Sequence, residues 1–246
     1  HYLDAEPIPG IEWEFQTLKQ ILPLVNADRL NDIAKNYVTD ENMIISFMAP
    51  EKETVLIPSN EVILATVAEV KKAEIAANEE EELNRPLITK EPKAGNIKKI
   101  STNPVFGTTE WVLSNGVTVV FKPTDFKKDE ILLSAFSYGG VSKVTNTNDL
   151  ISATLAAMVV GNNGIGDFSQ IELNKALTGK VASVSPQIGS YTEGFRGRSS
   201  VEDFKTMMQL LHLYFTSPRY DHEAYESLVN MYKATQIGRA SWRERV

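Results

Sequence analysis

The alternation of apolar and polar residues is clearest in residues 111–140. An Asn-Gly pair, Asn115-Gly116, lies between two alternating segments. This pair is the strongest short signal for a β-hairpin, because both residues of its tight turn need φ > 0. The residues on one face of the strand after the turn are Val117, Val119 and Phe121. A third strand is expected next, with one face formed by Ile131, Leu133 and Ala135.

Apolar residues at helical spacing predict helices in both parts of the chain. Before residue 58, we expect two helices and a strand, at 11–22, 26–37 and 43–48, with Asn26 or Asp28 capping the second helix. Further on, helices are expected at 149–160 and after Ser169, Ser200 and Asp221, with paired strands at 181–185 and 188–195. Strands, then helices, then strands and helices again argue for an α+β fold and against a doubly wound sheet.

Three of these helices carry more specific signals. Ser169 and Glu172 have the spacing of a capping box, and Gly179 can end the helix that they begin. The helix introduced by Ser200 and Asp203 is expected to bury Phe204, Met207, Leu211 and Phe215. The helix introduced by Asp221 is expected to bury Tyr225, Tyr232 and either Leu228 or Val229.

The composition changes along the chain and indicates several sections. Residues 58–107 combine a helical pattern with the acidic run Glu79–Glu82 and a segment rich in Lys, Pro and Gly, as is typical of a helix followed by a linker. Residues 108–236 then begin a new α+β domain. Residues 237–246, IGRASWRERV, resemble translated sequencing-adapter sequence, so we expect an artefactual tail, the alternative being a natural basic helix. The chain is accordingly expected to be a piece of a longer protein, open at both ends.

Composition excludes several classes of function. A net charge of −7 disfavours a nucleic-acid partner, which needs a basic face. The chain has no Cys, so disulfides and thiolate metal sites are excluded. No apolar run approaches the ~20 residues of a membrane span, while 42% hydrophobic residues are enough for a core.

Several short strings carry a resemblance to a known family. They are Leu113-Ser-Asn-Gly116, Lys122-Pro-Thr-Asp-Phe126, Ser137-Tyr-Gly-Gly140 and Tyr214-Phe-Thr-Ser-Pro-Arg219. With them, nearly all of residues 1–236 resembles the pitrilysin/insulinase family of zinc metallopeptidases, and in particular its large bacterial members with two peptidase-like halves. The resemblance implies a partial pitrilysin-like domain, an antiparallel or mixed sheet with helices packed on one face. It also implies that residues 1–57 end the second domain and that residues 108–236 begin the third.

The helix that should carry zinc in this family has no zinc ligand here. The family motif is H-x-x-E-H, whereas residues 149–160 read DLISATLAAMVV. If Met158 matches the Met that often follows the motif, the ligand positions fall on Ala153, Ala156 and Ala157. Alanine cannot bind zinc, so we expect no catalytic residue, no metal ligand and no cofactor in this chain.

The resemblance assigns the chemistry to the rest of the parent protein. Zinc would be bound by the missing N-terminal half, which would be this chain's partner, and the two halves would close around a peptide substrate. The family members with two halves imply a periplasmic or cell-envelope location in a bacterium. The chain would contribute chamber wall and interdomain contacts to a metallopeptidase.

Other candidate residues have simpler interpretations. His1 lies at the first position, and His212 has the surroundings of a packed histidine. His222-Glu223-x-x-Glu226 is similar to the H-E-x-x-H zinc motif but has Glu as its last residue, so charged residues in a first helical turn explain it as well. Gly161–Gly166 lacks the Gly-Lys-Ser/Thr ending of a phosphate-binding loop and is expected to connect two helices. A last group faces a chamber or a partner, or forms surface ion pairs: Glu193, Arg196 and Arg198.

Two alternatives to the noncatalytic segment remain open. One is a structural or peptide-binding paralogue in which neither half binds zinc, and the upstream sequence would separate it from the first hypothesis. The other is an unrelated metal-dependent enzyme that uses His222, Glu223 and Glu226, which metal analysis would reveal.

Overall fold

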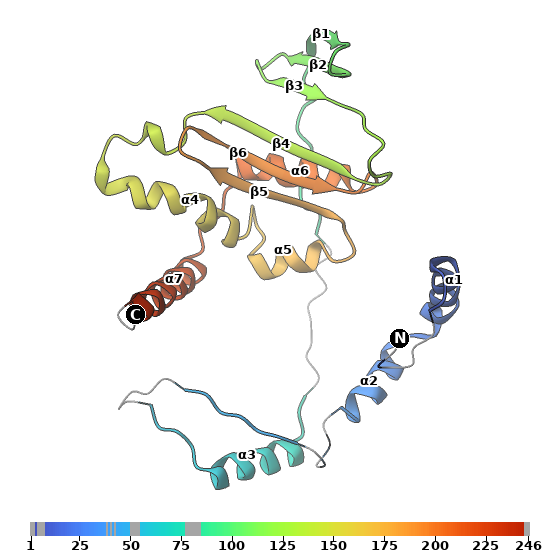
Figure 1. The fold of residues 1–246 in the computed structure, drawn as a ribbon, viewed down its shortest axis with the longest axis vertical. Coiled ribbons are helices and arrows are strands. Elements are labelled where there is room, and N and C mark those ends of the chain that lie inside the picture. Colours follow the sequence, from blue (N-terminus) through green and yellow to red (C-terminus); the bar gives the residue numbers. More distant parts are fainter. Residues whose placement is uncertain are drawn as a thin grey trace. The chain divides into compact units, whose positions relative to one another are not determined.

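The structure is a computed structural model that describes residues 3, 8–37, 39, 41, 43–49, 55–76 and 85–243, with side chains as far as residue 235. The chain divides into two compact units, residues 1–78 and residues 79–246. Figure 1 colours the first unit in blues and the second from green to red. Each unit is described by itself below.

The first unit consists of helices joined by irregular segments. Its elements are α1 (Ile11–Ile21), the 3-10 turn η1 (Leu22–Leu24), α2 (Ala27–Lys35) and α3 (Asn60–Lys72). The Asn26 side chain accepts a hydrogen bond of 2.9 Å from the Arg29 N–H, so Asn26 and not Asp28 caps α2. The strand predicted at 43–48 is wrong, because these residues pair with no other strand in the described part of the chain.

The helices of the first unit leave their apolar residues uncovered. No residue of α1, α2 or α3 is buried, and Trp13, Phe15 and Leu18 are 60%, 61% and 60% exposed. An amphipathic helix is stabilised mainly by burying such a face. The described residues of this unit therefore supply no core of their own.

The second unit begins with a small antiparallel sheet. Its strands are β1 (Ile97–Asn103), β2 (Thr108–Leu113) and β3 (Thr118–Phe121), in the order β1-β2-β3. Gly116 has φ of 87°, as the predicted Asn-Gly turn between β2 and β3 requires. The expected linker across 58–107 is wrong at its end, because β1 pairs with β2 from Ile97 onward.

A second antiparallel sheet contains the predicted third strand. It consists of β4 (Ile131–Tyr138), β5 (Ala182–Ile188) and β6 (Thr192–Ser199), in the order β4-β6-β5. The sequence places β4 next to the hairpin, yet β4 pairs with β6 across more than fifty residues of chain. The predicted pairing of the strands near 181–185 and 188–195 is confirmed, with bounds shifted by a few residues.

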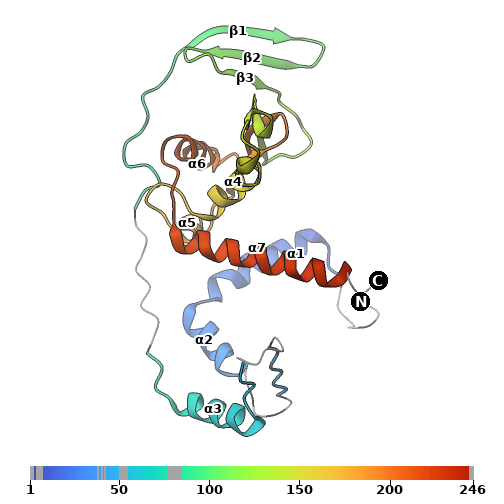
Figure 2. The same cartoon turned by 90° about the vertical axis from the view of Figure 1, so that its left-hand side faces the viewer.

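Helices surround this second sheet. They are α4 (Leu150–Asn162), α5 (Gln170–Ala176), α6 (Phe204–Thr216) and α7 (His222–Arg243), with short 3-10 turns η2 (Gly140–Lys143) and η3 (Thr147–Asp149) before α4. Figures 1 and 2 show α6 lying along one face of the sheet, where it contacts β5 and β6. The capping box of α5 is present, since Ser169 and Glu172 each bind the other's backbone N–H. The predicted α+β fold with antiparallel strands is thus confirmed.

The core of the second unit lies between the sheet, α5 and α6. Its buried residues are Ile165, Phe168, Leu173, Val184, Met207, Leu210 and Leu213. The predicted face of α6 is right at Met207 but wrong at Phe204 and Phe215, which are 42% and 68% exposed. Two apolar stripes run side by side along this helix, and only the position of the sheet decides which of them is buried.

The loop between α4 and α5 belongs to the core. Ile165 is fully buried, and its N–H donates to the Phe168 carbonyl at 2.8 Å. The Gly166 N–H donates to the Ser217 carbonyl at 2.9 Å. Because these N–H groups already have protein acceptors, this segment connects two helices and offers them to no phosphate.

Helix α7 runs from His222 to Arg243 and contacts α4. Leu228 is 8% exposed, as predicted, but Tyr225 and Tyr232 are 38% and 41% exposed. The backbone from residue 237 continues this helix, and its origin as an adapter-like tail remains a prediction.

A short segment of the expected linker is bound to the second unit. The Arg85 guanidinium donates to the Asp167 carbonyl and to a Glu172 carboxylate oxygen, each at 2.8 Å, and lies 4.3 Å from the centre of the Phe168 ring. Leu87 and Ile88 pack against the core. Glu91 pairs with Lys205. Residues 85–91 are therefore part of the second unit.

Limited digestion with a Glu-specific protease should reflect this division. We expect the first cut within the acidic run Glu79–Glu82, because its polar composition predicts few buried backbone contacts. Cleavage at Glu91 should be slower, since its neighbours contact the second unit. Mass spectrometry of early products is the measurement, and a first cut at Glu130 would contradict the domain division.

Asp203 connects the end of β6 to the start of α6. Its carboxylate accepts hydrogen bonds from the Val181 N–H at 2.8 Å and the Ser200 hydroxyl at 3.0 Å, and it lies 3.4 Å from the Lys180 ammonium. The Val181 N–H is the main cause that holds the pKa of Asp203 below its usual value. Ionised Asp203 therefore stabilises the fold above the ordinary Asp pKa, and this contribution is lost as pH falls through the lowered pKa.

Replacing Asp203 by Ala should lower the thermal midpoint by about 3 °C or more at pH 7, because buried donors lose their acceptor. The difference between wild type and Asp203→Ala should shrink when the pH is lowered below about 4. Glu202→Ala, next to it and exposed, is the control and should have little effect. Thermal unfolding followed by circular dichroism tests this, and a pH-independent difference would contradict the electrostatic part.

Candidate functional site

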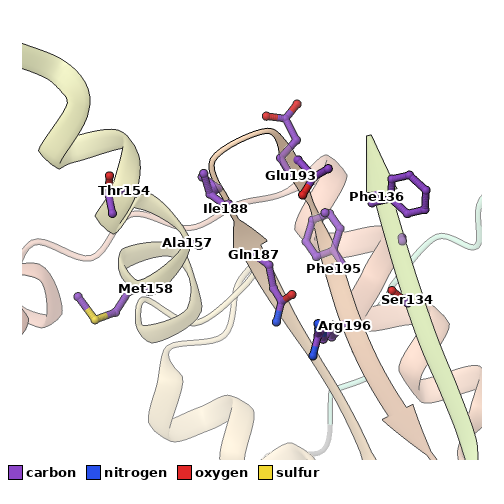
Figure 3. Close-up of a pocket in the computed structure, with 14 residues that line it drawn as sticks. Ser134, Phe136, Thr154, Ala157, Met158, Gln187, Ile188, Glu193, Phe195 and Arg196 are labelled. Carbon is purple, nitrogen blue, oxygen red and sulfur yellow. The ribbon is translucent and has the colours of Figure 1, made fainter. Parts of the chain in front are cut away.

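An open pocket of about 540 Å³ lies between α4 and the second sheet. Figure 3 shows α4 on one side of it and strands β5, β6 and β4 on the other. Helix α4 contributes Thr154, Ala157 and Met158. The side chains labelled on the strands are Ser134, Phe136, Gln187, Ile188, Glu193, Phe195 and Arg196.

Helix α4 stands where the family resemblance places the zinc-binding helix. The predicted helix at 149–160 is confirmed as Leu150–Asn162, and α4 contacts β5 and α7. Ala153, Ala156 and Ala157 are all partly buried. A methyl group has no lone pair for a metal and no proton to exchange. This helix supplies packing surface, and Ala157 places that surface at the pocket.

The strand wall of the pocket is built by the two-residue alternation of β-structure. Arg196 lies directly opposite Ser134 of β4 and Ser185 of β5. Two residues further along β6, Arg198 bonds a Glu130 carboxylate oxygen at 2.7 Å. Of the two arginines singled out by the sequence, Arg198 therefore forms the surface ion pair and Arg196 lines the pocket.

Glu193 holds the chain where β4 ends. Its two carboxylate oxygens accept hydrogen bonds from the Ser137 hydroxyl at 3.3 Å and from the Gly140 N–H at 3.1 Å. Gly140 has φ of 62°, and a Cβ there would lie 2.3 Å from the Gly189 carbonyl oxygen. Glycine is thus required at this turn, and Glu193 has a structural role at the rim of the pocket.

The histidine candidates do not come together. His212 is partly buried in α6. At the exposed start of α7, His222 Nε2 lies 3.4 Å from Glu226 and Nδ1 lies 3.3 Å from the Tyr220 hydroxyl. His1 lies outside the described residues.

No described group of residues fits a zinc site. Within the described residues, no cluster of three or more His, Asp or Glu side chains could hold a metal ion. His222 and Glu226 are two groups, whereas a zinc site needs three or four protein ligands. The expected absence of zinc from the whole chain stays a prediction.

These features define a class of protein. The chain contains an α+β domain in which a helix after a Gly-Gly turn packs beside an antiparallel sheet, as in pitrilysin-like peptidase domains. No protein-family model matches the chain.

Comparison with known proteins makes the relationship specific. A zinc protease PQQL-like protein of Arabidopsis thaliana is 31% identical over 165 residues, which cover 67% of this chain and 17% of that protein. The periplasmic protease PqqL of Escherichia coli has a similar structure, with a TM-score of 0.55 and 20% identity over 71% of this chain and 19% of PqqL. The ferredoxin protease FusC in complex with Arabidopsis ferredoxin gives 0.51 and 19%, over 89% of this chain and 24% of FusC.

The chain is therefore a pitrilysin-like sequence with the fold of these peptidases, and the resemblance inferred from its sequence is confirmed. It spans less than a fifth of the length of the curated relative. Among the described residues, no helix has the length and apolar character to cross a membrane.

Sequence reasoning missed most of the pocket. It singled out Arg196 and the alanines of α4, but not Ser134, Thr154 or Gln187. The alternation of polar residues in 183–187 was a usable signal for a solvent-facing strand surface. Nothing in the sequence shows that this strand lies beside α4.

Purified, dialysed protein should contain no stoichiometric zinc and should not cleave a quenched fluorescent peptide. The reason is that α4 has alanine at all three positions aligned with the motif. Elemental analysis by mass spectrometry is the measurement, with His222→Ala as the matched variant. Near-equimolar zinc that disappears in His222→Ala would favour the unrelated metal enzyme instead.

Proposed function

We propose that this chain is a noncatalytic segment of a zinc-dependent metallopeptidase, in which it contributes chamber wall and contacts between domains. The observation that carries the proposal is α4. It occupies the place of the zinc-binding helix in a pitrilysin-like fold, yet it presents Ala157 and Met158 to the pocket. A helix of this kind supports a surface, and the hydrolytic chemistry must come from another part of the parent protein.

The two units support different parts of this role. The proposed division has residues 1–57 ending one peptidase-like domain, 58–107 containing a helix and a connector, and 108–236 beginning a domain without zinc ligands. The uncovered apolar faces of α1 and α2 fit the first assignment, because such faces need a partner surface. The open pocket beside α4 fits the last, because a chamber wall must stay accessible to peptide.

A structural or peptide-binding paralogue remains the second candidate. It shares every feature of this chain and differs only in the partner half, which would lack H-x-x-E-H. Zinc analysis of the complete parent protein distinguishes the two.

Complementation tests the proposal directly. The zinc-bearing half of the parent, alone, should bind zinc but cleave a fluorogenic peptide poorly, because half of the chamber that orients the peptide and excludes water is missing. Adding the complete second half in trans should restore activity. Replacing Ala153, Ala156 or Ala157 by Ser in that half should barely change the rescue, since these residues carry packing and no chemistry.

One outcome contradicts this function. If the isolated zinc-bearing half is already as active as the whole protein, the second half is dispensable for catalysis. Mutations that weaken the contact between the halves serve as the positive control, since they should reduce the rescue strongly.

A further inference from the structure

Arg196 is a cation among neutral neighbours. On its face of the sheet, the directly opposite residues are Ser134 and Ser185. The next residues on the same face of β4 and β5 are Leu132, Phe136, Ser183 and Gln187. None of them carries a charge, so the sheet offers no carboxylate beside this guanidinium.

The contrast with Arg198 shows that this is a property of the position. Arg198 lies on the same face of the same strand, but its guanidinium bonds Glu130 at 2.7 Å. No hydrogen bond or ion pair of the Arg196 side chain is found among the described residues. A guanidinium has five N–H donors in a planar fork that matches a carboxylate.

The acid that lies closest along the chain does not neutralise Arg196. Glu193 is three residues away in β6, and an odd spacing places the two side chains on opposite faces of the strand. Its carboxylate oxygens accept hydrogen bonds from Ser137 and Gly140. The donors of Arg196 therefore stay available to a molecule in the pocket.

The remainder of the pocket fits an extended peptide. Its volume of about 540 Å³ is in the range of small-ligand sites, roughly 300–1,000 Å³. Phe136, which is 68% exposed, and Met158 provide apolar surface in the same lining, while Ser134, Thr154 and Gln187 provide neutral hydrogen-bonding groups. An occupant with one anionic side chain next to an apolar residue satisfies both kinds of surface.

We propose that this pocket binds an acidic side chain of an extended peptide and that Arg196 is the specificity-determining residue. The inference rests on the proposed role as a peptide-facing wall and adds the chemistry that the wall prefers. The partner is an Asp or Glu side chain within an unfolded segment. A nucleic-acid partner is disfavoured by the net charge of −7 of the chain.

Three fluorescein-labelled nonapeptides test this, identical except for Glu, Gln or Lys at the centre and with an apolar residue beside it. Fluorescence anisotropy with the complete chain at low salt should show the Glu peptide binding about threefold more tightly than the Gln peptide, the size expected of a partly exposed ion pair. The Lys peptide should bind most weakly. The preference should fall at about 0.5 M salt, because exposed charges are screened.

Matched variants assign the preference to one residue. Arg196→Gln should bind the Glu and Gln peptides equally, Arg196→Lys should keep part of the preference, and Arg198→Gln should keep all of it. Circular dichroism shows that each variant is folded. As a second readout, the methyl signal of Met158, assigned with Met158→Leu, should shift on adding the Glu peptide.

The outcomes separate this inference from the proposed function. Equal binding of the Glu and Gln peptides to wild type, a preference that survives in Arg196→Gln, or no binding of any peptide overturns the inference. Complementation by the second half can succeed in each of those cases. Conversely, a clear Glu preference together with failed complementation supports the pocket and rejects the chamber-wall role.

Discussion

The two-residue alternation in strands β4, β6 and β5 is the constraint on which the second unit depends. Phe195 packs against Tyr214 and Phe215, with ring centroids 5.7 and 4.8 Å away, while its neighbour Arg196 lines the pocket. A slip of one residue would exchange these two side chains between the faces. Gly197 fixes the alignment, because a Cβ there would lie 3.1 Å from the Met207 sulfur and 3.1 Å from the Ser183 carbonyl oxygen. The same register thus sets both the core and the exposed surface.

Helix α4 shows how a peptidase-like fold remains intact without metal ligands. Its residues are apolar on several sides, and its partly buried alanines allow close packing. A buried His or Glu without a metal would cost free energy, because its polar atoms would lose water and gain no ligand. Alanine at these positions avoids that cost, so the fold keeps its helix while the chemistry belongs elsewhere in the proposed parent.

The segment before the hairpin has two physical characters. Residues 85–91 are attached to the second unit through Arg85, Leu87 and Ile88. The acidic run Glu79–Glu82 that precedes them offers only charge repulsion and solvation. Composition identifies such a run reliably, but it cannot show that one arginine six residues away stacks on Phe168, since that contact joins residues 83 positions apart.

Local chemistry was sufficient to predict the elements. The Asn115-Gly116 turn, the Ser169–Glu172 capping box and the helix at 149–160 all follow from interactions within a few residues, and all are present. The missing ligands at Ala153, Ala156 and Ala157 are likewise visible in the sequence alone. The sequence did not show that Ile97–Asn103 forms a strand, that β4 pairs with β6, or that Leu210 and Leu213 face the sheet instead of Phe204 and Phe215. Those outcomes depend on contacts between distant segments, where several apolar faces compete and only the assembled packing selects one of them. For the same reason, only the tertiary structure distinguishes Arg196, which lines a pocket, from Arg198, which bonds Glu130.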